Sequence, residues 1–203
     1  MIKEVSSRKG AILRRIAGVC GITSQLVAFT ALLVAISASP RFRWTENDIS
    51  VLGVEGSATA LFNWGLILTG LLSLIFAIGL GQGFLSSRLG QLGMASLILG
   101  SISMSAIGIF PRTIDLPHDV ASIAFFVFII IALLLVGVAA ITASQMRWGL
   151  LSLMAGVLML AFWLVPWPWS GGAIPQLLCC LPWSLWTIVF GVGLLVRASP
   201  VDI

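Results

Sequence analysis

The chain has 203 residues, of which 59% are hydrophobic and only 9% are charged. Soluble domains carry about 25% charged residues, so most of this chain cannot face water and an ordinary soluble enzyme is excluded. The basic residues near the N-terminus, part of a net charge of +4, adjoin an apolar run. They predict an anchor on anionic lipid headgroups rather than a nucleic-acid-binding arm.

Six apolar runs are long enough to cross a bilayer as α-helices. A hydrocarbon core of about 30 Å requires about 20 helical residues. In chain order, the predicted spans are 16–37, 59–80, 91–110, 120–143, 150–166 and 177–196. The first run is far longer than the apolar part of a signal peptide, about 7–15 residues, so we expect a retained helix. We predict an all-α integral membrane fold, a six-transmembrane-helix bundle formed as one domain by residues 1–203.

Proline and glycine mark the connection between the last two spans. Pro166 and the Trp-Pro-Trp that follows it indicate the end of the fifth span at the membrane interface. Gly171, Gly172 and Pro175 then predict a turn into the sixth span, because glycine and proline favour turns over continued helix. Pro182 lies inside the sixth span.

The distribution of basic residues predicts the orientation, because cytoplasmic loops accumulate lysine and arginine. With a cytoplasmic N-terminus, the inner segments contain Lys3, Arg8, Lys9, Arg14, Arg15, Arg88, Arg147 and Arg197. The outer loops then contain only Arg41, Arg43 and Arg112, together with Glu46, Asp48, Glu55, Asp115 and Asp119. We therefore expect both termini in the cytoplasm and the chain in the cell membrane.

The three cysteines lie in apolar segments and are expected to be free. Cys20 is near the inner end of the first span, whereas Cys179 is near the outer end of the last one. The adjacent Cys179 and Cys180 point about 100° apart on a helix of 3.6 residues per turn. Buried cysteine commonly acts as a small hydrophobe, and no zinc, phosphate-loop or HExxH motif is present.

Polar side chains collect in the two predicted outer loops, 39–58 and 111–119, and just below them. The candidate binding rim consists of Trp44, Asp48, Glu55, Asn63, Arg112, Asp115, His118, Asp119 and Ser122. Purely structural roles are also open: Asp119 could cap the fourth helix, and Arg112 could pair with Asp115. We expect His118 to lie within one side-chain length of segment 48–50 or of Asn63, because acidic or amide neighbours stabilise charged histidine.

Short motifs resemble those of a known family. They are Asp48-Ile-Ser-x-Leu-Gly, Phe62-Asn-Trp-Gly-Leu-Ile-Leu, and Gly108-Ile-Phe-Pro with a later His118 and Ser122. Together they resemble an uncharacterised archaeal and bacterial family of multi-pass membrane proteins, the domain of unknown function DUF998. The Ile-Ser-x-x-Gly piece also faintly resembles the Frag1/DRAM/Sfk1 membrane proteins. The resemblance spans the chain and supplies no mechanism, but it implies a shared pattern of Asp48, Ser50, Gly53, Asn63, Gly65, Pro111 and His118.

Two functional hypotheses follow from the rim. The preferred one is a non-enzymatic module that binds a membrane lipid, with a second membrane subunit or a further copy of the chain as other partners. The alternative is a membrane-embedded lipid hydrolase. Its candidate catalytic residues are Ser50, His118 and Asp48 in a Ser-His-Asp arrangement, or a metal held by His118, Asp48 and Asp119. A single histidine excludes a three-histidine zinc site.

Proton-coupled transport and haem binding are disfavoured, whereas a neutral pore stays open. Ion-coupled carriers place ionisable residues inside the membrane, whereas the six predicted spans contain no Asp, Glu, Lys, Arg or His. Gln25 and Asn63 are the strongest polar groups in them. One histidine rules out bis-histidine haem ligation, although His118 with a methionine stays open, and the sequence identifies no cofactor.

The orientation can be tested by cysteine labelling in intact cells, starting from a cysteine-free variant. A single cysteine at Thr45 or Thr113 should react with a membrane-impermeant maleimide, because both positions are expected outside. A cysteine at Ser86 should react only after the membrane is permeabilised. Labelling of Ser86→Cys in intact cells, with protection of the other two, would reverse the orientation.

Overall fold

The computed structural model describes residues 2–84 and 86–196, and within them the chain is helical and contains no strand. The elements are α1 (Ile2–Ser37), the short 3-10 helix η1 (Ile49–Gly53), α2 (Thr59–Gly81), α3 (Arg88–Ile109), α4 (Asp115–Thr142), α5 (Met146–Leu164) and α6 (Ala173–Val196). In these described residues, six helices are long and apolar enough to cross a membrane. The predicted all-α, six-helix membrane fold is confirmed.

Five of the six helices begin before the predicted span, and in α4 and α6 the difference moves residues with a predicted loop role into a helix. Helix α4 starts at Asp115 instead of residue 120, so His118 and Asp119 lie inside it and the N-cap position is Ile114. The predicted capping role of Asp119 is therefore wrong. Pro117 is accommodated because the first turn of a helix has N–H groups without intrahelical partners. Helix α6 likewise begins before Pro175, which lies in its first turn and not in the preceding connection.

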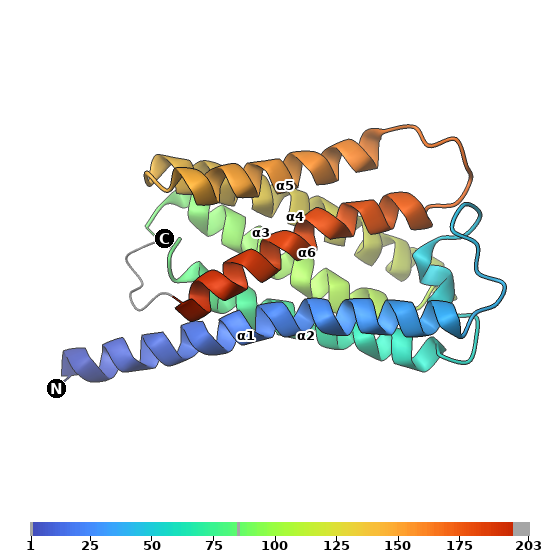
Figure 1. Ribbon diagram of the computed structural model, residues 1–203, viewed down its shortest axis with the longest axis horizontal. Coiled ribbons are helices and arrows are strands. Elements are labelled where there is room, and N and C mark those ends of the chain that lie inside the picture. The colour runs from blue at the N-terminus through green and yellow to red at the C-terminus, as the bar shows by residue number, and fades with distance from the viewer. Residues whose placement is uncertain (1, 85, 197–203) are drawn as a thin grey trace.

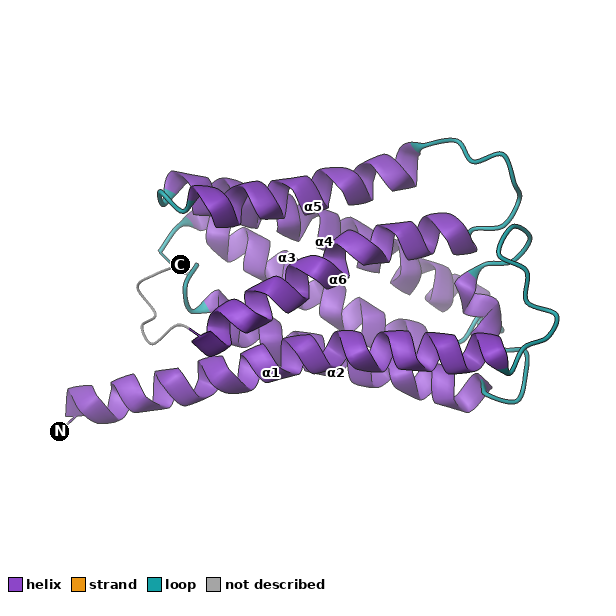
Figure 2. Cartoon of the chain, in the orientation of Figure 1, coloured by secondary structure: helices purple, strands orange, loops and turns teal. Residues whose placement is uncertain are grey.

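The six helices form a closed ring in chain order. Each helix packs against the next one, and α6 returns to pack against α1 (Figure 1). Successive helices run in opposite directions, so the connections 38–58, 110–114 and 165–172 meet at one end, on the right in Figure 2. We call this end the long-loop end. The connections that include residues 82–84 and 143–145 lie at the opposite end.

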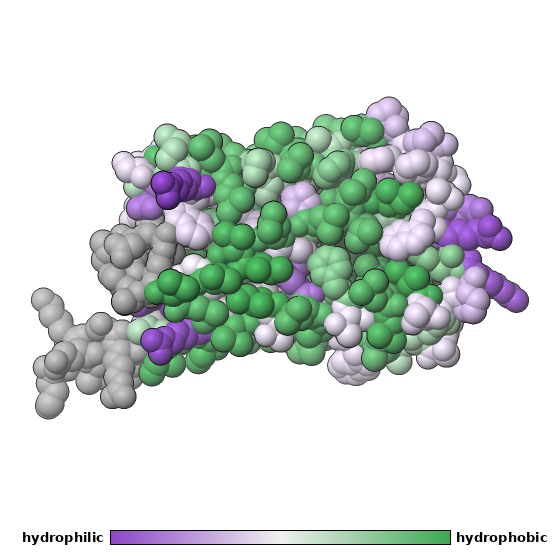
Figure 3. Space-filling model, in the orientation of Figure 1, coloured by the Kyte–Doolittle hydropathy of each residue, from purple (hydrophilic) through white to green (hydrophobic). Residues whose placement is uncertain are grey.

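The ring is filled by large apolar side chains and is also apolar on its outside. Phe76, Leu97 and Trp186 are almost completely buried between the helices. By contrast, Leu26 and Leu33 on α1 are more than half exposed. Hydrophobic residues cover the middle of the surface, while hydrophilic ones gather toward the ends (Figure 3). A surface of this kind suits hydrocarbon, where helices satisfy their own backbone hydrogen bonds.

Glycine allows α2 and α3 to approach closely. A Cβ atom at Gly70 would lie 2.5 Å from the Ser105 nitrogen and 2.6 Å from the Ser101 oxygen, both backbone atoms. A Cβ atom at Gly81, on the same helix, would meet only the side chain of Met94, at 3.6 Å. Small residues at such crossings let transmembrane helices pack backbone to backbone.

Replacing Gly70 by alanine should therefore destabilise the bundle, whereas Gly81→Ala should not. Overpacking of this kind costs about 1–3 kcal/mol, whereas the contact of an alanine at position 81 with Met94 is an ordinary van der Waals contact. Thermal unfolding in detergent should show a lower midpoint for Gly70→Ala than for Gly81→Ala. Equal midpoints for the two variants would contradict the close α2–α3 contact.

Candidate functional site

Asp48 joins the three connections of the long-loop end. Its Oδ1 accepts a hydrogen bond from the Gly172 backbone N–H at 2.9 Å, and its Oδ2 forms an ion pair with Arg112 Nη1. The same Nη1 lies 3.3 Å from the Ser50 hydroxyl. The predicted pairing of Arg112 with Asp115 is therefore wrong. Asp48 stands at the N-cap position of η1, but its side chain does not cap that helix. We call Asp48, Arg112 and Gly172 the clasp.

Backbone N–H groups form further hydrogen bonds between the first connection, the third connection and the start of α6. The Gly171 N–H donates to the Thr45 carbonyl at 3.0 Å, and the Ile49 N–H donates to Gln176 Oε1 at 2.9 Å. The contact depends on glycine, because a Cβ atom at Gly171 would lie 2.6 Å from the backbone nitrogen of Asn47. The clasp and these bonds fix the start of η1 against the start of α6.

A pocket of about 170 Å³ adjoins the clasp, and we call it the end pocket. Its polar lining consists of Asp48, Ser50, Arg112, His118, Asp119, Ser122 and Gln176. Its apolar lining consists of Ile49, Phe62, Leu66, Met104, Ile107, Phe125, Phe126 and Cys180. Five of the nine predicted rim residues thus line one pocket. A larger hollow of about 450 Å³ is lined only by residues between Ser39 and Gly56, so it does not gather side chains from different helices.

The end pocket changes from polar to apolar with depth. Leu66 and Cys180 each follow the first residue of their helix by seven positions, which corresponds to about 10 Å at 1.5 Å per residue. Asp48 and Arg112, in contrast, belong to the connections themselves. The pocket is therefore polar where it meets the long-loop end and apolar inside the bundle.

His118 is buried in the pocket wall, with 5% of its surface exposed. Its Nδ1 lies 2.8 Å from the carbonyl oxygen of Phe110, and its Nε2 lies 3.4 Å from Ser122 Oγ. A carbonyl oxygen can only accept, so Nδ1 carries the hydrogen in this contact. In the neutral ring Nε2 is then an acceptor, and it faces the hydroxyl of Ser122.

The partners of His118 differ from the expected ones. His118 lines the same pocket as Asp48 and Ser50, but it bonds to a backbone carbonyl and a hydroxyl rather than to an acid or an amide. The Ser50-His118-Asp48 arrangement is not formed, because Arg112 contacts both Ser50 and Asp48.

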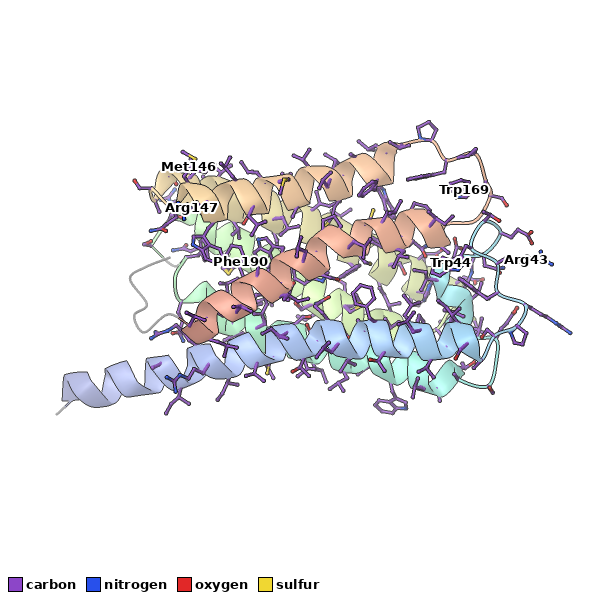
Figure 4. The ribbon with its side chains drawn as sticks, viewed as in Figure 1. Arg43, Trp44, Met146, Arg147, Trp169 and Phe190 are labelled. Carbon is purple, nitrogen blue, oxygen red and sulfur yellow. The ribbon has the colours of Figure 1, made fainter. Side chains whose placement is uncertain are left out.

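The remaining rim residues have other roles. Asn63 donates to the Gly53 carbonyl at 2.9 Å and so ties α2 to η1. Trp44 packs edge-on against Phe42 at the long-loop end, where Trp169 also lies (Figure 4). Glu55 and Asp115 are exposed and do not line the end pocket.

The sequence interpretation missed Gln176, whose side chain joins α6 to η1. A lone amide side chain directly before the last apolar run could have indicated a polar contact. The predicted span began one residue after Gln176, so this residue was not considered. The apolar lining was also missed, since nothing in a uniformly apolar helix distinguishes a pocket residue from a core residue.

The predicted metal donors do not converge. Among the described residues, no group of three or more His, Cys, Asp or Glu side chains is placed to hold a metal ion. The carboxylate of Asp48 is directed instead to Arg112 and Gly172. Cys20, Cys179 and Cys180 are free thiols, as predicted.

Comparison with known families agrees with the motifs in the sequence. The model of the family described as "Protein of unknown function (DUF998)" matches residues 22–193, a range that includes the clasp and the whole end pocket. The chain belongs to the DUF998 family. No curated protein and no solved structure is significantly similar to this DUF998 protein. It is therefore a multi-pass membrane protein whose function must be argued from its own site.

Removing the carboxylate of Asp48 should destabilise this DUF998 protein. Asp48→Ala leaves the Gly172 N–H and the Arg112 guanidinium without their acceptor, a loss of about 1–3 kcal/mol. Glu46→Ala is the matched control, since Glu46 pairs with Arg43 at 3.6 Å on the exposed surface, where ion pairs contribute about 0–1 kcal/mol. Thermal unfolding in detergent should show the larger fall for Asp48→Ala, and the reverse order would refute the clasp.

Proposed function

We propose that this DUF998 protein is a lipid-binding module of the cell membrane. The end pocket holds the polar headgroup and the first carbons of a membrane lipid. The observation that carries the proposal is the change of the lining with depth, from Asp48, Arg112 and Asp119 near the connections to Leu66 and Phe126 within the bundle. A lipid has the same order of polarity along its length.

The size of the pocket is consistent with part of a lipid. Pockets for whole small molecules measure about 300–1,000 Å³, whereas the end pocket measures about 170 Å³. A headgroup with its first carbons fits this volume, and the remaining chain lies along the apolar helices in the bilayer.

The charges of the pocket favour a zwitterionic headgroup. A guanidinium has five N–H donors, and both contacts recorded for Arg112 within the described residues use Nη1. Its other donors can therefore serve a phosphate, which guanidinium recognises well. Asp119 is exposed on the same pocket and offers a carboxylate to an amine.

We infer that the long-loop end faces the outside of the cell. Arg14 and Arg15 lie in the part of α1 far from this end, and Arg88 and Arg147 lie at the starts of α3 and α5 at the opposite end. The positive-inside rule assigns that opposite end to the cytoplasm. The end pocket then draws on lipid of the outer leaflet.

A tryptophan that fills the pocket should displace the lipid. Ile107 lines the end pocket on α3, while Ile109 on the same helix is 55% exposed and does not line it. Native mass spectrometry of the purified protein should detect bound phospholipid in the unchanged protein and in Ile109→Trp. In Ile107→Trp the bound fraction should fall at least several-fold. Equal retention by both variants would show that the pocket is not the lipid site.

A further inference from the structure

Ser122 differs from four other helix serines in its hydrogen bond. Within the described residues, hydroxyls that donate to the carbonyl four positions earlier belong to Ser101, Ser103, Ser152 and Ser184. This is the usual hydrogen bond of a serine hydroxyl inside a helix. The contact recorded for Ser122 is instead with His118 Nε2, at 3.4 Å.

His118 is held so that its acceptor nitrogen faces that hydroxyl. The Phe110 carbonyl fixes Nδ1 as the protonated nitrogen, at 2.8 Å. A hydroxyl beside a base that a third group orients is the recurring arrangement of an activated nucleophile. The separation of 3.4 Å is slightly longer than a catalytic hydrogen bond, as is common without substrate.

We propose that Ser122 and His118 form a nucleophile–base pair that cleaves a carboxylic ester of an amphiphile. This rests on the proposed function, since the end pocket must hold that amphiphile. The pair differs from the arrangement expected from the sequence, because the serine is Ser122 instead of Ser50. The group that orients His118 is the Phe110 carbonyl instead of Asp48.

The position of Ser122 along α4 selects an ester as the bond to be cleaved. The pocket residues of α4 before Ser122 are His118 and Asp119, and those after it are Phe125 and Phe126. Ser122 therefore stands where the lining changes from polar to apolar. In an ester lipid, the ester group also lies between the headgroup and the hydrocarbon chain.

The reaction balances with water as the second substrate. Ser122 Oγ bonds to the carbonyl carbon while its proton passes to His118 Nε2. The ester C–O bond then breaks, and the alcohol leaves with the proton from His118. Water next gives a proton to His118 and attacks the acyl carbon, after which the bond to Ser122 Oγ breaks. Oγ recovers the proton, and a carboxylic acid leaves.

Gln176 is a neutral donor in the lining of the end pocket, and we assign it to the oxyanion. Its Oε1 accepts from the Ile49 N–H at 2.9 Å, which fixes the orientation of the amide. Within the described residues its amide N–H₂ group has no recorded partner, and the residue lines the end pocket. Glutamine side chains stabilise tetrahedral intermediates in this way.

The proposal can be tested on the full chain in detergent with p-nitrophenyl octanoate and a fluorophosphonate probe. The unchanged protein should hydrolyse the ester, and the probe should modify Ser122, as located by peptide mass spectrometry. Ser122→Ala should abolish labelling and lower the hydrolysis rate at least about a hundredfold. Ser103→Ala is the matched control, a helix serine outside the pocket, and should keep the full rate.

The outcomes separate this proposal from lipid binding. Bound lipid in Ser103→Ala, measured by native mass spectrometry, should equal that of the unchanged protein, because Ser103 lies outside the end pocket. Lipid binding without hydrolysis or labelling of Ser122 would overturn the catalytic pair and leave the proposed function standing. Hydrolysis that depends on Ser122, in a protein that retains no lipid, would support the catalytic pair and overturn the proposed lipid-binding function.

Discussion

The long-loop end depends on one charged side chain. The carboxylate of Asp48 binds the Arg112 guanidinium and the Gly172 backbone N–H, and so connects three segments that the helices alone would leave independent. In lipid each helix satisfies its own backbone, so the helices place few constraints on their connections. Charge-assisted hydrogen bonds are directional and stronger than neutral ones. They hold η1 and the start of α6 in the positions from which Ile49, Ser50 and Gln176 line the pocket.

Helix α4 gives the end pocket its chemical order. It begins with a first turn that carries Asp115 and His118 and continues into an apolar stretch that reaches the core at Phe125. Ser122 marks the change between these two parts. The two proposed activities therefore place different demands on the same helix. The proposed lipid binding needs the change from polar to apolar lining, whereas the proposed ester cleavage needs the orientation of one imidazole ring.

Much of the fold follows from the sequence, but the partners in the site do not. Long apolar runs must be helical in a bilayer, which is why the predicted start of α2 is also the observed one. The starts of α4 and α6 were missed because a proline in a first turn looks the same in sequence as a proline in a loop. Asp48 and His118 were identified as candidates by residue type. The contacts of Asp48 could not be identified in this way, because its partners lie 64 and 124 positions away in the sequence.

The contact between α1 and α6 has a consequence for biosynthesis. Helices enter the membrane in the order of translation, and the ring stays open until the last one arrives to pack against the first. Until then the α1 face that includes Gly18 has no partner, since that glycine packs against the backbone of Gly191. The end pocket is also incomplete, because Gln176 and Cys180 belong to α6. A nascent chain stalled before its sixth helix would therefore present an unpaired helical surface to membrane chaperones and proteases, and its end pocket would lack one wall.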